Sequence, residues 1–77
     1  MKTLDEFVKL FAEQFEETEE NLFAPDTEFR TLDEWSSLIS LSVIAMVDEE
    51  FDVALKGADI GNATTIEGLY NIVISKL

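Results

Sequence analysis

The stretch that decides the fold runs from Glu34 to Phe51 and reads EWSSLISLSVIAMVDEEF. It opens with two small hydroxyl residues, continues through apolar positions at helical spacing, and ends in three acids and a phenylalanine. Serine is favoured just before a helix, because its side-chain oxygen accepts a hydrogen bond from a free backbone N–H. We therefore predict one helix that begins at Ser36 or Ser37, with Ser36 as the N-cap, and ends near Phe51 or Asp52.

The apolar residues of this helix cover more of its circumference than one buried stripe requires. The positions that follow the helical period, and are expected in the core, are Val43, Ile44, Val47 and Phe51. The apolar residues that flank this stripe are Leu38, Leu41, Ala45 and Met46. We expect part of this excess to face a partner, while for Leu38 and Met46 burial at the centre of a bundle is an equal alternative.

A second amphipathic helix is predicted near the start of the chain. Thr3 and Glu6 have the spacing of a capping box, in which each side chain accepts a hydrogen bond from the other residue's backbone N–H. The apolar residues that then recur three and four positions apart are Leu4, Phe7, Val8, Phe11 and Phe15. These features predict a helix from about Leu4 to Glu17.

The end of the chain repeats this pattern. Thr64 and Glu67 form another capping-box pair. One apolar stripe follows, made of Ile66, Leu69, Tyr70, Val73 and Leu77. We predict a final helix from about Thr65 to Lys76, in which Lys76 lies near the negative end of the helix dipole.

The connections complete an all-α fold. Residues 18–34 lack a helical period and include Pro25, yet apolar side chains occur there at Leu22, Phe23, Phe29 and Leu32. A solvated linker would not need them, so this long loop is expected to lie across the helices with these side chains inward. Between Gly57 and Gly61 one or two helical turns fit. The prediction is a single domain, residues 1–77: a small four-helix bundle with three main helices and one short one.

Composition excludes several classes of function. The 77 residues carry a formal charge of -12 and contain neither cysteine nor histidine. Such a field repels nucleic acid and anionic lipid and favours basic protein surfaces as partners; it also favours a monomer. Thiolate chemistry and a histidine-activated nucleophile are excluded, and we find neither a glycine-rich phosphate loop nor a calcium-binding loop. We therefore expect neither an enzyme nor a metal protein. The acidic start and the lack of a long apolar run predict a cytoplasmic protein without membrane insertion.

Taken together, these features resemble the acyl carrier protein family. In that family the serine of an Asp-Ser-Leu triplet carries phosphopantetheine, and its spacing to the phenylalanine after the closing acids matches that of Ser37 to Phe51. Phe29 and the sequence Thr64-Thr65-Ile66 also match in order and spacing. The chain departs from the family in that Ser36 replaces the aspartate of the triplet. In addition, Ile39 and Ser42 stand where family members often carry acids.

The resemblance implies a carrier function. Phosphopantetheine would be attached to Ser37 by a phosphopantetheinyl transferase, because only Ser37 directly precedes Leu38 at the family spacing. Acyl intermediates held as thioesters would then be presented to fatty-acid or related biosynthetic enzymes with basic docking patches. The residues expected to contact those partners are Leu38, Leu41, Met46, Asp48, Glu49 and Glu50. Two alternatives remain: a specialised carrier of an aminoacyl or polyketide unit, and an unmodified acidic helical adaptor.

Overall fold

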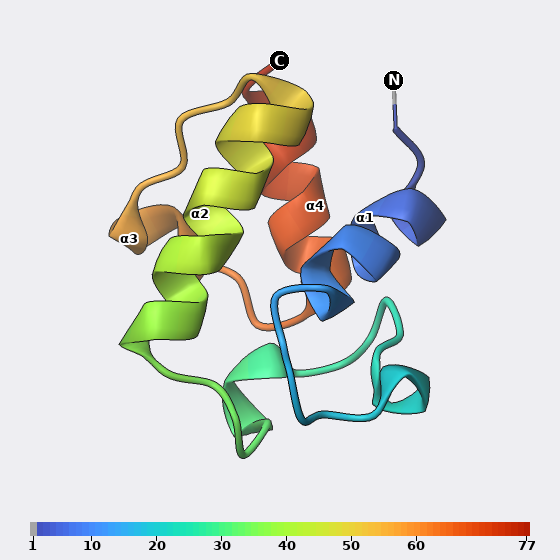
Figure 1. Cartoon of the computed structure of the whole chain (residues 1–77). Helices are drawn as coiled ribbons and strands as arrows, with labels where there is room; N and C mark the ends of the chain where they lie inside the picture. The colour runs from blue at the N-terminus through green and yellow to red at the C-terminus, as the bar shows by residue number, and fades with distance from the viewer. Residues whose placement is uncertain (1) are drawn as a thin grey trace.

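The apolar spacing of the chain produces four α-helices in the computed structural model, which describes residues 2–77. They are α1 (Leu4–Ala12), α2 (Ser37–Phe51), α3 (Gly57–Gly61) and α4 (Ile66–Ser75), with short 3-10 helices η1 (Glu20–Leu22) and η2 (Phe29–Thr31). These described residues form no β-strand. In Figure 1, α1, α2 and α4 make up the body, and the long loop between α1 and α2 crosses the end opposite the two chain termini. The predicted small helical bundle is confirmed.

One apolar core holds the helices together, and aromatic rings supply much of it. Phe7 and Phe11 of α1 are fully buried and meet rings from other elements. Phe7 lies edge-on to Phe51 of α2, with ring centroids 5.6 Å apart, and Phe11 lies 5.5 Å from Phe29 of η2. The remaining buried residues of α2 and α4 are Ile39, Val43, Met46, Val47, Ile66, Leu69 and Val73. The core therefore joins α1, α2, α4 and the long loop.

Helix α1 is shorter than predicted. It begins at Leu4 with the expected Thr3 and Glu6 capping box, but it ends at Ala12 instead of continuing to Glu17. In a continued helix the backbone N–H of Glu16 would bond to the carbonyl of Ala12. That carbonyl instead accepts from Phe15 N–H at 3.0 Å, which tightens the turn and leaves the next amides for another partner. Phe15 is buried even though it lies beyond the helix.

Helix α2 begins and ends as predicted. The hydroxyl of Ser36 accepts a hydrogen bond from the backbone N–H of Ile39 at 3.3 Å, which makes Ser36 the N-cap. At the other end Asp52 is in the left-handed conformation, with φ of 56°, and its N–H donates to the carbonyl of Asp48. A left-handed residue commonly ends a helix, because it turns the chain out of the helical path.

The burial of individual residues corrects part of the sequence analysis. Ile44 was expected in the core, yet it is only partly buried, and Ile39 takes a buried position on α2 instead. In the long loop Phe23 and Phe29 are buried as predicted and Leu32 is partly buried, whereas Leu22 is exposed, as are the other residues of η1. Periodicity gives the angle between side chains but not which loop will cover them.

The last two helices are tied to each other and to the loop. The cap of α4 is Thr65 rather than the predicted Thr64, since the Thr65 hydroxyl accepts from Gly68 N–H at 3.0 Å. Lys76 pairs with Asp59 of α3 at 3.5 Å. Arg30 of the long loop donates to the carbonyl of Ile60 at 2.7 Å. Helix α3 is therefore held from both sides despite its five residues.

Candidate functional site

Ser37 is the first residue of α2, and its side chain is exposed. The amides of the first helical turn point towards this end, which carries the positive end of the helix dipole. Ser36 uses its hydroxyl as the cap, whereas none of the side-chain hydrogen bonds found among residues 2–77 involves the Ser37 hydroxyl. A phosphate ester on Ser37 would therefore lie where a helix terminus favours negative charge.

The residue before the serine pair is packed against aromatic rings. Trp35 is half-buried, and its ring lies 4.9 Å from that of Phe29 between centroids. It also stacks on Phe11 at 6.3 Å with only 4° between the ring planes, and on Phe15 at 6.3 Å. Neither composition nor apolar spacing assigned this ring to the site. Its contacts reach residues up to 24 positions away, which is why spacing alone could not indicate them.

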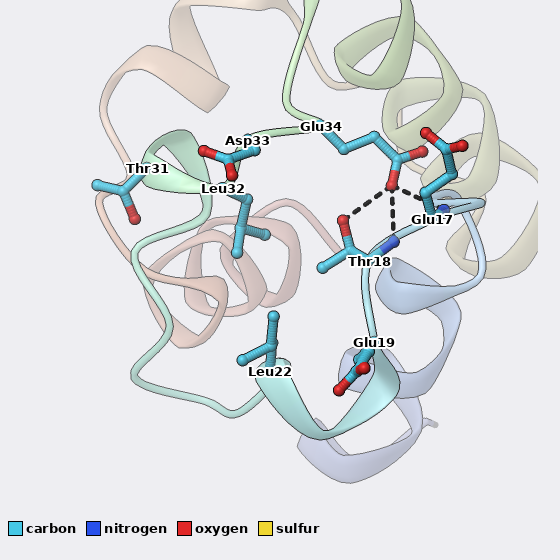
Figure 2. Close-up of a pocket in the computed structure, with 8 residues that line it drawn as sticks. All are labelled: Glu17, Thr18, Glu19, Leu22, Thr31, Leu32, Asp33 and Glu34. Atoms are coloured by element: carbon cyan, nitrogen blue, oxygen red, sulfur yellow. Dashed lines mark hydrogen bonds between the residues drawn. The ribbon is translucent and has the colours of Figure 1, made fainter.

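Glu34 is the second residue that the sequence analysis missed. Its carboxylate accepts hydrogen bonds from the backbone N–H groups of Glu16, Glu17 and Thr18 at 2.8, 3.0 and 2.9 Å, and from the Thr18 hydroxyl at 2.8 Å. Figure 2 shows this carboxylate turned towards Thr18 at the wall of an open surface pocket of about 600 Å³. The hydrogen bond from Glu16, reinforced by those from Thr18 and Glu17, holds the pKa of Glu34 below its usual range against a smaller opposing effect of burial.

The residues expected to contact partners fall into three groups. Leu38 and Leu41 are 73% and 63% exposed, although leucine usually lies inside a protein. Asp48, Glu49 and Glu50 are exposed on the last turns of the same helix. Met46 does not belong to this surface, because it is only 5% exposed and packs in the core. Ile39 is also turned inward, so it adds no contact area beside Ser37.

Charge is distributed unevenly along α2. The helix carries no charged side chain from Ser37 to Val47 and then three acids in succession. Glu50 is partly neutralised by an ion pair with Lys2 at 3.4 Å, which leaves Asp48 and Glu49 as the stronger contributors to the local negative field. We name the exposed residues Ser37, Leu38, Leu41, Asp48 and Glu49 the α2 face. Its apolar part lies beside Ser37 and its acidic part lies at the far end of the helix.

Within residues 2–77, none of the helices has both the length and the apolar character that crossing a bilayer requires. The chain was compared with protein-family models, with curated proteins and with solved structures, and none of the three comparisons gave a match. The candidate site therefore rests on the arrangement of the α2 face and of the segment that precedes it.

Proposed function

We propose that this chain is an acyl carrier protein that holds acyl intermediates as thioesters on a phosphopantetheine arm attached to Ser37. The observation that carries the proposal is the exposed hydroxyl of Ser37 at the start of α2, beside a serine that already caps the helix. The resemblance to the carrier family in the order and spacing of Ser37, Phe51 and Thr65 supports the same assignment.

The proposal requires no reactive group of the chain other than the Ser37 hydroxyl, which fits a composition without cysteine or histidine. In the attachment step the Ser37 oxygen gives its proton to a base of the transferase and bonds to the phosphorus of the pantetheine phosphate, while the bond from that phosphorus to the oxygen of adenosine bisphosphate breaks and the bisphosphate leaves. The thiol of the arm supplies the sulfur for the thioester, so the protein itself needs no cysteine. Its own contribution is presentation of the arm and contact with partner enzymes through the α2 face.

Partner enzymes would meet this face through basic residues opposite Asp48 and Glu49 and apolar contacts to Leu38 and Leu41. Complementary charge raises the rate of association more than the final affinity, which suits a carrier that must also dissociate. The identity of the cargo is set by the enzyme that loads the arm, and fatty acyl, aminoacyl and polyketide units all fit the same attachment chemistry.

Incubation with coenzyme A and a broad-range phosphopantetheinyl transferase tests the proposal. Intact-mass spectrometry should show one added phosphopantetheine on the wild type and on Ser36→Ala, and none on Ser37→Ala. Circular dichroism on each variant confirms that it is folded. Folded wild-type protein that stays unmodified would overturn the carrier function and favour an acidic adaptor. Modification that persists in Ser37→Ala would move the site to another hydroxyl.

A further inference from the structure

Three consecutive backbone N–H groups, those of Glu16, Glu17 and Thr18, converge on one carboxylate. They lie just beyond α1, where the chain has left the helix and cannot use carbonyls of the preceding turn. Oε2 of Glu34 accepts from Glu16, and Oε1 accepts from Glu17, Thr18 and the Thr18 hydroxyl, with every distance between 2.8 and 3.0 Å. Successive amides in such a turn form a concave anion site, and here a side chain of the same molecule occupies it.

This contact fixes the end of the long loop immediately before the candidate attachment site. Glu34 lies three residues before Ser37, and the two residues between them are also anchored. Trp35 stacks against Phe11 and Phe29, and Ser36 caps α2. Three consecutive residues therefore hold the chain to α1, to the loop and to α2, and the next residue carries the exposed hydroxyl.

Attraction to positive side chains does not explain why Glu34 is held there. The acids Glu17, Glu19 and Asp33 line the same pocket, and no basic residue does. In a chain with a formal charge of -12, placing a fourth carboxylate beside them is unfavourable unless the backbone amides compensate. The carboxylate of Glu34 therefore acts on the conformation of the loop, through its hydrogen bonds to the backbone amides.

We propose that Glu34 is a positioning residue for the modification of Ser37, because it fixes the segment 34–36 to the end of α1 and keeps Ser37 in the orientation that a modifying enzyme accepts. The inference rests on the proposed carrier function. Without Glu34 the segment would sample other arrangements, and only a fraction of the molecules would present Ser37 correctly. Apparent affinity for the enzyme falls in proportion to that fraction, whereas the chemical step in the bound complex does not change.

The kinetics of phosphopantetheine transfer to Glu34→Ala test this proposal. At a temperature where every variant is folded, KM for the carrier should rise roughly three- to tenfold with kcat unchanged. Asp33→Ala is the matched control, because it removes the same charge from the neighbouring position, and its side chain takes part in none of the hydrogen bonds found among the described residues. An unchanged KM in Glu34→Ala, or an equal rise in Asp33→Ala, would overturn the proposal.

Two further measurements separate positioning from general stability. Glu34→Gln keeps a side-chain oxygen that can accept from the same N–H groups, so its KM should lie between those of Glu34→Ala and the wild type, whereas free acetate, which cannot tie those amides to residue 34, should not lower the KM of Glu34→Ala. Amide exchange measured by NMR should become faster in Glu34→Ala at Trp35 and Ile39, whose N–H groups bond to the Leu32 carbonyl and the Ser36 hydroxyl, and remain unchanged in α4. If the wild type is not modified at all, the proposed function fails. The exchange rates then decide by themselves whether Glu34 fixes this segment, and unchanged rates would refute it.

Discussion

The two ends of α2 differ in composition and in how they are attached. At the start, Ser37 and Leu38 are exposed, uncharged and preceded by a segment that is anchored at three consecutive residues. At the end, Asp48 and Glu49 are exposed acids, and Phe51 anchors the helix in the core. By the rise of an α-helix the two ends lie about 22 Å apart.

This difference separates two tasks along one helix. An enzyme that modifies a serine must reach its hydroxyl in a fixed geometry, and the helix terminus must tolerate a phosphate group. Both requirements are local to the start of α2. Attraction of a basic partner acts over longer distances and needs no fixed geometry, so acids at the far end can supply it. The role of the start of α2 therefore depends on contacts with the long loop. The role of its end depends on the charge of the acids and on the buried ring of Phe51.

The largest effect is expected from the core anchor at the end of α2. Phe51→Ala should lower the free energy of unfolding by about 3–5 kcal/mol, because it removes a buried ring that meets Phe7 edge-on. Leu41→Ala, on the exposed side of the same helix, should change stability by less than about 0.5 kcal/mol. Urea unfolding of both variants measures this contrast, and similar losses would mean that Leu41 is covered in solution.

A smaller effect is expected at the start of the helix. Ser36→Ala removes the hydroxyl that accepts from Ile39 N–H and should cost about 1 kcal/mol, or about 4–8 °C in Tm. Ser36→Asp keeps an acceptor and adds negative charge at the positive end of the dipole, so it should raise the stability by roughly 0.5 kcal/mol. Thermal unfolding measures both variants, and a gain in stability for Ser36→Ala would contradict the cap.

The smallest effect is expected from the acids, and only in function. Glu49→Lys should slow transfer of phosphopantetheine at low salt by a few-fold, because it weakens the attraction of a basic partner, and the difference from wild type should vanish at high salt. Glu67→Lys makes the same charge change on the exposed surface of α4 and serves as the control. Equal slowing in both variants would show that net charge matters and the α2 face does not.

Features that depend on neighbours in sequence could be predicted. The Thr3 and Glu6 cap, the start of α2 at Ser37 and the short helix between glycines all follow from local patterns that the structure reproduces. For Leu38 and Met46 the sequence left partner contact and burial as equal alternatives, because both lie outside the predicted core stripe. Only the packing of the other helices decides that Met46 is buried and Leu38 exposed.

Contacts that span the long loop could not be predicted in the same way. Glu34 lies 16–18 residues from the backbone amides that donate hydrogen bonds to it. A glutamate in a loop of an acidic chain gives no sign of such partners. Those amides are available only because α1 ends at Ala12, a boundary that the periodicity extended to Glu17. The early end of α1 and the role of Glu34 were therefore missed together.

The position of Trp35 has a practical consequence. It is the single tryptophan of the chain, two residues before Ser37, with its ring half-buried among phenylalanines. Its intrinsic fluorescence therefore reports on the segment next to the candidate attachment site without any added dye. Release of that segment, or of the phenylalanine rings on which Trp35 packs, would expose the indole to water and move its emission to longer wavelengths.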